Sequence, residues 1–134
     1  MIAATARART VAAPRPFQIN FEHRPDYLYV AVWGTENSYE VARHYWQRIV
    51  AMLHHRHYSR VLVEKYFTEP LSSADALRLV SELAHTHCHA RIAVVERSYN
   101  EEHAKFEELV ASNRGLQITI VPELAKAEAW LMQH

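Results

Sequence analysis

Glycine is almost absent from this sequence, and its scarcity excludes two large groups of nucleotide-binding proteins. Only Gly34 and Gly115 occur among 134 residues, where an average usage of ~7% would supply about nine. The phosphate-binding loops of P-loop and Rossmann proteins need several backbone positions without a Cβ atom, and two distant glycines cannot form either motif. Nucleotide chemistry of these two kinds is therefore excluded.

Disulfides, long apolar runs and an excess of one charge are missing as well. The single cysteine, Cys88, cannot form an internal disulfide. No apolar run approaches the ~20 residues that cross a bilayer. Fifteen basic residues balance fifteen acidic ones, so no basic excess favours nucleic acid or anionic membranes. We expect a soluble, cytoplasmic protein with no nucleic-acid partner and no transmembrane segment.

What the sequence does contain is enough for one compact domain. Apolar residues make up 49% of the chain and charged residues 22%, which is the composition of a folded protein. Residues 1–16 carry alanine and arginine without an acid, a mixture that transit peptides share and that is also typical of a frayed tail. We expect a disordered N-terminal tail over residues 1–16 and a single α/β domain over residues 17–134.

Two kinds of apolar pattern predict the strands and their places in a sheet. Residues 17–22 and 116–120 alternate apolar and polar side chains, as edge strands do. Residues 61–63 and 92–95 are apolar throughout, which is typical of central parallel strands. Residues 27–33 follow the first strand after a short turn, so this pair forms an antiparallel hairpin.

Between and after these strands the period changes to that of a helix, with Asn37 or Ser38 and then Ser72 as predicted N-caps and Gly115 as a helix end. The predicted fold is a five-stranded mixed sheet in sequential order, strand-strand-helix-strand-helix-strand-helix-strand-helix, with the first strand antiparallel. Right-handed crossovers that advance in one direction place the helices mainly on one face. The other face then needs a cover.

The second strand directs its aromatic side chains towards that other face. Leu28, Val30 and Val32 share one parity and are assigned to the helix side, whereas Tyr27, Tyr29 and Trp33 lie on the opposite parity. This aromatic strip is too large to stay in water. It can be a homodimer interface, the floor of a lipophilic-ligand site, or a surface covered by residues 1–16, and we favour the homodimer.

The carboxyl ends of the strands are the usual ligand site of an open α/β sheet. Aromatic and charged side chains gather there and suit a small amphipathic ligand or a peptide partner; alternatively, the charged ones only solvate the strand ends. The candidate binding residues at this rim are Trp33, Tyr66, Phe67, Glu96 and Ser98. Ser98 and His103 form no recognisable triad, because no third member or oxyanion site can be named.

Two histidine clusters end the first and second helices at the opposite rim. His54 with His57, and His85 with His89, have spacings that one helix turn can bring to a metal. The alternative is electrostatic, because a protonated imidazole is favourable at a helix C-terminus. No second metal motif accompanies them, so we assign no metal and no cofactor. Cys88 has histidine neighbours, but adjacent side chains usually point in different directions, and we assign it no catalytic role.

Several short segments between about Phe17 and Leu131 resemble one known family. They are Tyr45-Trp46, Val61-Leu62-Val63-Glu64, Pro70-Leu71-Ser72, Ile92-Ala93-Val94-Val95, Phe106-Glu107-Glu108-Leu109, Asn113-Arg114-Gly115-Leu116 and Ala127-Glu128-Ala129-Trp130-Leu131. Together they resemble the SpoIIAA-like branch of the STAS superfamily, the sulfate-transporter and anti-sigma-factor-antagonist domains. The resemblance implies the same β-α fold and a bacterial regulatory protein.

The resemblance also points to the start of the second helix. Anti-sigma-factor antagonists are switched by phosphorylation of a serine there, within Asp-Ser-Ser/Thr-x-x-Gly. Here residues 71–76 read Leu-Ser-Ser-Ala-Asp-Ala, without the Asp or the Gly. Ser72 and Ser73 are the candidate phosphoacceptors, and helix capping is their alternative role. We expect a non-enzymatic regulatory or protein-interaction module; the alternative is binding of a small lipophilic ligand, at the strand carboxyl rim or on the aromatic face.

Overall fold

The computed structural model describes residues 16–133, so the tail expected over residues 1–16 lies almost wholly outside the described residues. Strands and helices alternate as the patterns predict. The elements are β1 (Gln18–His23), β2 (Leu28–Trp33), α1 (Tyr39–Arg56), β3 (Arg60–Tyr66), α2 (Ser73–Ala84), β4 (Arg91–Glu96), α3 (Glu101–Asn113), β5 (Gln117–Val121) and α4 (Leu124–Leu131).

The five strands form one sheet in the order β1-β2-β3-β4-β5, which confirms the predicted topology. β1 pairs antiparallel with β2, placing Gln18 opposite Trp33. The other neighbours are parallel, with Leu28 opposite Val61 at the start of β3. All four parallel strands therefore end at the same carboxyl rim of the sheet, and the α1, α2 and α3 helices begin there.

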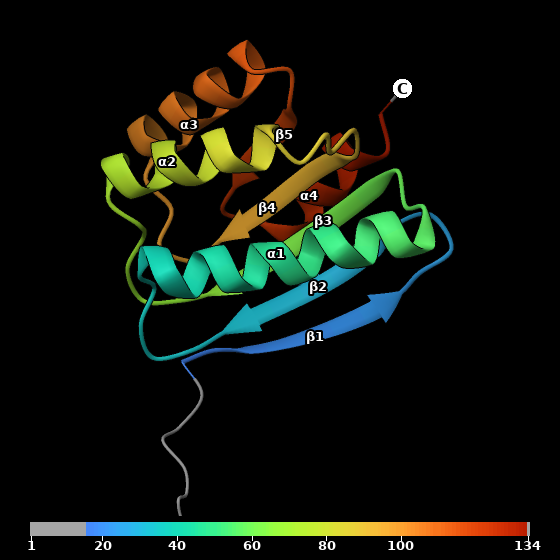
Figure 1. Cartoon of the computed structure of the whole chain (residues 1–134), viewed down its shortest axis with the longest axis horizontal. Helices are drawn as coiled ribbons and strands as arrows, with labels where there is room; N and C mark the ends of the chain where they lie inside the picture. Colours follow the sequence, from blue (N-terminus) through green and yellow to red (C-terminus); the bar gives the residue numbers. More distant parts are fainter. Residues whose placement is uncertain (1–15, 134) are drawn as a thin grey trace, which may run out of the picture.

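Helices α1, α2 and α3 cover one face, as predicted, but α4 lies on the opposite face (Figure 1). The first three helices each connect two parallel strands, so right-handed crossovers fix their side. No further strand follows α4 in the described chain, and it is free to fold back under the sheet. From the sequence, we expected this second face to be covered by something other than a helix of the domain, and α4 corrects that expectation for the part of the face that it covers.

The core is divided between the two faces. On the α1–α3 side the inward parity of the central strands packs against the helices, with Val30, Val63 and Ile49 buried. On the α4 side Tyr27, Leu62 and Val95 pack against Ala127 and Leu131. The apolar side chains of β3 thus belong to two separate clusters according to their parity, Val61 and Val63 to one and Leu62 to the other.

The helix ends follow the predicted local chemistry. The side chains of Ser38 and Ser72 cap α1 and α2, and the Asn100 side chain caps α3. Gly115 has φ 82°, the left-handed conformation that a helix end favours in glycine. His57 adopts the same region with φ 58° and ends α1. In the described part of the chain, no helix is both long and apolar enough to span a membrane.

Candidate functional site

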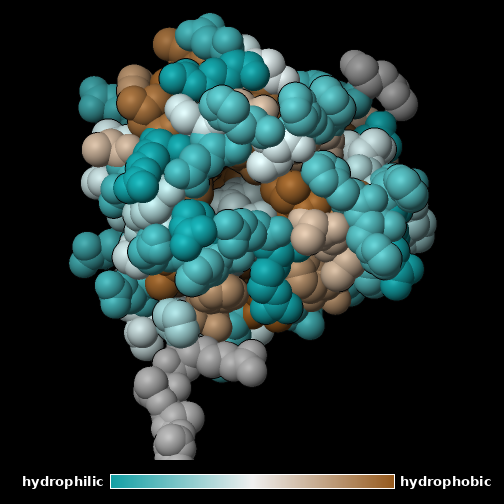
Figure 2. All heavy atoms as spheres, viewed as in Figure 1, coloured by the Kyte–Doolittle hydropathy of each residue, from teal (hydrophilic) through white to brown (hydrophobic). Residues whose placement is uncertain are grey.

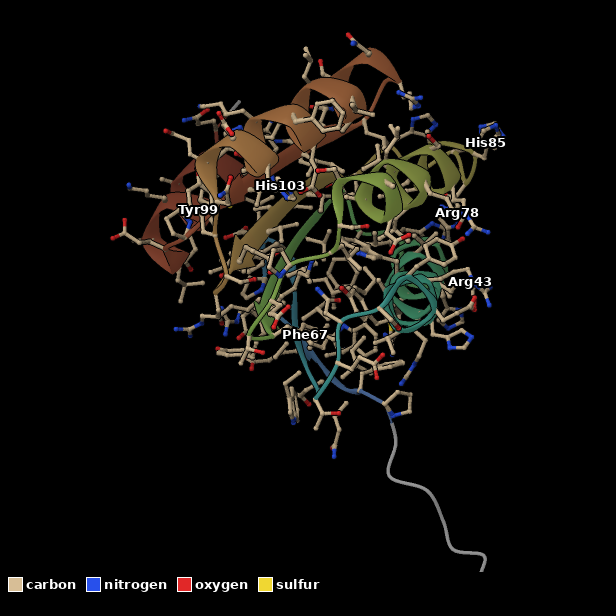
Figure 3. All side chains as sticks on the ribbon, turned by 90° about the vertical axis from the view of Figure 1, so that its left-hand side faces the viewer. Arg43, Phe67, Arg78, His85, Tyr99 and His103 are labelled. Carbon is tan, nitrogen blue, oxygen red and sulfur yellow. The ribbon has the colours of Figure 1, made fainter. Side chains whose placement is uncertain are left out.

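The carboxyl rim brings together residues that are far apart in the sequence. β3 ends at Tyr66 and β4 at Glu96, while α2 begins at Ser73 and α3 at Glu101. Figure 3 looks onto this end of the molecule, with Phe67 on the α1 side and Tyr99 and His103 on the α3 side. The two candidate serines therefore lie beside the end of β4.

The structure separates the roles of the two serines. Ser72 is the N-cap of α2, and its Oγ accepts a hydrogen bond from the backbone N–H of Asp75 at 3.2 Å. Ser73 is the first helical residue; its exposed Oγ lies 3.0 Å from His103 Nε2 of α3. Ser72 thus performs the predicted capping role, and Ser73 has its hydroxyl at the surface beside an imidazole.

A buried lysine lies beneath this surface. Lys65 is only 7% exposed, and its Nζ is 3.0 Å from Glu96 Oε2. Burial lowers the pKa of the Lys65 ammonium, but the Tyr45 hydroxyl and the Glu96 carboxylate raise it by more, so the net shift is upward. Ser98 Oγ donates to the other Glu96 oxygen at 3.3 Å. Glu96 and Ser98, both predicted at the rim, therefore belong to one network anchored by Lys65.

A second carboxylate faces the same buried ammonium. Glu107 of α3, with Lys65 and Glu96, lines a small cavity of ≈ 40 Å³ whose other walls are mainly apolar. Burial raises the pKa of the Glu107 carboxyl, and the charge of Lys65 opposes this shift. Two carboxyl groups and one ammonium therefore share a space large enough for a water molecule. The arrangement can hold a proton or a small polar group.

Phe67, predicted as a binding residue, lies in the core instead. It is 3% exposed, and its ring stacks on Tyr45 with a centroid distance of 5.9 Å. Tyr45 is fully buried, and burial raises the pKa of its hydroxyl. Phe67 follows the last residue of β3 and turns inward, so most of its side chain supports the rim from within, although it still forms part of the wall of a hollow of ≈ 240 Å³ beside Asn37 and Pro70.

On the opposite face, the aromatic strip is divided between the α4 contact and solvent. Tyr27 is buried under α4 and donates to Glu128 Oε2 at 2.7 Å. Tyr29 is half-buried and donates to the carboxylate of Glu64, which is 5% exposed. Burial and this hydrogen bond both raise the pKa of the Tyr29 hydroxyl. Part of the strip thus has an intramolecular cover that was not among the three predicted ones.

The remaining aromatic residues are exposed and adjacent. Trp33 is 40% exposed and Tyr66 38%, and they stand opposite one another on β2 and β3. The guanidinium of Arg97 lies 4.5 Å from the centre of the Tyr66 ring and forms an ion pair with Glu64 at 3.3 Å. Trp33 and Tyr66 therefore remain available for a partner, at the edge of the predicted rim.

The two histidine clusters do meet, but not in a metal-binding arrangement. A hollow of ≈ 420 Å³ at the amino rim is lined by His54, His57 and His89, together with Cys88. His85 lies outside this lining and hydrogen-bonds through Nδ1 to the carbonyl of Ser81 at 2.7 Å. Among the described residues, no group of three or more His, Cys, Asp or Glu side chains is placed to hold a metal ion.

Cys88 is buried beside these histidines. Burial raises the pKa of its thiol, whereas a nucleophilic cysteine needs a lowered one. The structure therefore gives Cys88 the environment of a core side chain.

An apolar groove separates α1 from α2. It has a volume of ≈ 410 Å³ and is lined by Trp46, Val50, Leu79 and Leu83, with Arg43 and Glu82 among its polar residues. Figure 2 shows it as a hollow on the helix-covered side, with hydrophobic residues at its bottom. Trp46, Leu79 and Leu83 also line the cavity around Lys65, so the two spaces share a wall.

Sequence reasoning missed Lys65, Glu107 and the groove. Lys65 is one of the charged residues at the strand ends, for which solvation was one expected role, and it continues the parity of Val61 and Val63, which face the helices. That parity is a usable signal for its burial. Glu107 lay inside a quoted family segment, but no pattern in the sequence indicates that it faces β3.

Solved structures include examples of the same fold. The chain matches an anti-sigma factor antagonist from Mycobacterium paratuberculosis with a TM-score of 0.57 and 11% identity, covering 92% of this chain and 100% of that one. It matches an uncharacterized protein with a SpoIIAA-like fold from Shewanella loihica PV-4 with a TM-score of 0.51 and 15% identity, covering 90% and 97%. No protein-family model and no curated protein matches the sequence. The chain therefore has a STAS-type, SpoIIAA-like fold.

Proposed function

We propose that this SpoIIAA-like domain is a non-enzymatic regulatory module that binds a protein partner at its carboxyl rim and is switched by phosphorylation of Ser73. The observation that carries the proposal is the exposed Ser73 hydroxyl, 3.0 Å from His103 Nε2 at the start of α2. Ser72 is already engaged as the helix cap. The likeness to an anti-sigma factor antagonist supports this choice at the level of fold.

A phosphate at Ser73 would act locally. It adds about two negative charges and three acceptor oxygens, at a helix N-terminus that favours negative charge. The imidazole of His103 is within hydrogen-bonding distance of the Ser73 hydroxyl and can donate to such a phosphate when protonated. The helix is therefore retained, and the change is one of surface charge, which alters the choice of partner.

Exposed side chains near the same rim supply the contact surface. Trp33 and Tyr66 present adjacent aromatic rings, and large aromatic side chains of this kind dominate many protein interfaces. On the helix side of the same rim, the Lys65–Glu96–Ser98 network fixes the end of β4. A rigid rim with an exposed aromatic pair and a modifiable hydroxyl suits a switchable protein contact.

Phosphate incorporation tests this proposal. The purified protein is incubated with ATP and a soluble extract of its source organism, and phosphopeptides are mapped by mass spectrometry. We expect phosphate on Ser73 in the wild type and in Ser72→Ala, and none in Ser73→Ala. Ser98→Ala is the matched control for a neighbouring hydroxyl. Equal phosphorylation of wild type and Ser73→Ala, or none in either, contradicts the proposal.

The second candidate function is binding of a small lipophilic ligand, and the α1–α2 groove favours it. The groove is lined mainly by apolar side chains and has a volume of ≈ 410 Å³, within the usual range for small-molecule sites. Native mass spectrometry of untagged protein tests it. A noncovalently bound mass that Leu79→Arg removes and Trp33→Ala retains supports this site. The opposite pattern supports the aromatic face instead, and no bound mass contradicts both.

A further inference from the structure

The two edges of the sheet are finished differently. At β5, the Glu108 carboxylate of α3 accepts a hydrogen bond from the backbone N–H of Ile120 at 2.7 Å and another from Thr119 Oγ1 at 3.1 Å. The backbone N–H of Ile120 therefore already has an intramolecular acceptor. A paired edge cannot be extended by another strand at that point.

In the described part of the chain, β1 has no equivalent protection. Its six residues pair with β2 in one unbroken register, without a bulge, and the strand contains neither proline nor lysine. Among residues 16–133, no side chain hydrogen-bonds to the backbone of β1, and no described element lies beyond it (Figure 1). Charged side chains, lysine above all, together with proline and bulges are the usual devices that prevent edge strands from pairing. The one carboxylate of β1, Glu22, is near the end of the strand and pairs with Arg24. Within residues 16–133, nothing thus prevents the β1 edge from pairing with another strand.

From these observations, we propose that a second copy of this chain pairs antiparallel with β1, two-fold symmetric about Asn20, joining the two sheets. In that register Ile19 stands opposite Phe21 of the second copy, and Asn20 opposite Asn20. Ile19 and Phe21 are both half-buried and already pack against the core on the helix side. Pairing would complete the burial of these apolar side chains and give the exposed backbone groups of both strands partners.

The side chains on the other face are compatible with this register. Gln18 of one copy stands opposite Glu22 of the other, and the polar, exposed Asn20 lies at the axis. No like charges face each other, because Glu22 meets a neutral amide rather than its own copy. A self-complementary strand of this kind fits the isologous interface of a two-fold dimer.

Oligomeric state tests the proposal. Light scattering after gel filtration should give twice the 15.6 kDa of the chain. Asn20→Lys places two ammonium groups against each other at the axis, so we expect half that mass, with an unchanged circular dichroism spectrum. Gln117→Lys, at the exposed start of β5, is the matched control and should remain dimeric. A monomeric wild type, or a dimer that Asn20→Lys leaves intact, overturns the proposal.

A crosslink tests the register separately. In a Cys88→Ser background, Asn20→Cys places two thiols opposite each other across the axis, with the ~4.5–5.5 Å Cα separation of directly opposed antiparallel residues. Disulfides span Cα separations of ~4.4–6.8 Å, so oxidation should give a covalent dimer. Gln18→Cys, whose partner is Glu22, should crosslink far less. Equal crosslinking of both variants contradicts pairing centred on Asn20.

Discussion

Glu64 and Lys65 are consecutive residues of β3, yet they stabilise opposite faces of the sheet in different ways. Lys65 points towards α1–α3 and pairs with Glu96, whose side chain is itself only 12% exposed. Glu64 points away from these helices and pairs with Arg97, whose side chain is 53% exposed. One ion pair is therefore almost wholly enclosed by protein, and the other has one partner in solvent. Burial of both partners, rather than the number of charges, determines how much each pair matters.

The largest expected effect follows from removing the enclosed cation. Lys65→Met keeps an unbranched side chain but leaves the buried Glu96 without its counter-charge. We expect the free energy of unfolding to fall by about 3–5 kcal/mol, measured by urea denaturation. Lys105→Met, at an exposed position of α3, is the control and should change stability little. If Lys65→Met lowered the free energy of unfolding less than Glu64→Gln does, the ranking of the two ion pairs would be reversed.

A smaller effect is expected on the other face. In Glu64→Gln the amide oxygen can still accept from the Tyr29 hydroxyl, while the exposed Arg97 regains its hydration. We expect a loss of about 1–2 kcal/mol in the same denaturation experiment. Glu22→Gln removes a carboxylate from an exposed ion pair with Arg24 and provides the baseline. A Glu64 variant as stable as this control would mean that its burial contributes nothing.

The smallest effect depends on pH and concerns Glu107, which lies on the same side of the sheet as Lys65. Burial raises the pKa of Glu107 in the folded protein, so the folded state holds this proton more tightly than the unfolded chain. Its contribution to stability is present below the unfolded pKa and is lost as pH rises through the raised folded pKa. Glu107→Gln should therefore be more stable than wild type above that pKa, with the difference vanishing in acid.

Denaturation of both proteins at a series of pH values measures this difference, because all other titrating groups are common to the pair. Glu102→Gln, an exposed carboxylate on the same helix, should show no such advantage. A Glu107 difference that grows as pH falls would contradict the assigned direction of the shift.

Strand order was predictable because edge strands alternate apolar and polar residues, whereas central strands are apolar throughout. The alternating residues 17–22 and 116–120 predicted edges, and the structure places β1 and β5 there. The alternation along β3 also indicates the side to which Lys65 points, since Lys65 follows Val61 and Val63 at intervals of two. Its burial did not follow from this pattern, because charged residues are rarely buried without a partner and the partner, Glu96, lies on another strand.

The site itself was less predictable, for a physical reason. The contact between Ser73 and His103 joins two helices, and their relative rotation depends on core packing that no local pattern records. The place of α4 was missed because the crossover rule applies only to helices that connect parallel strands. Phe67 was assigned to the binding rim by composition, whereas its stacking on Tyr45 is a tertiary contact.

The position of α4 also has a consequence for the order in which the molecule is made. Because α4 follows β5 in the chain, a ribosome releases it only after all five strands have been synthesised. Until then Leu62, Ala93 and Val95, which are buried in the finished protein, have no helix to cover them. A sheet that assembles before α4 docks would therefore have a bare apolar face, the kind of surface that makes folding intermediates aggregate and that chaperones bind.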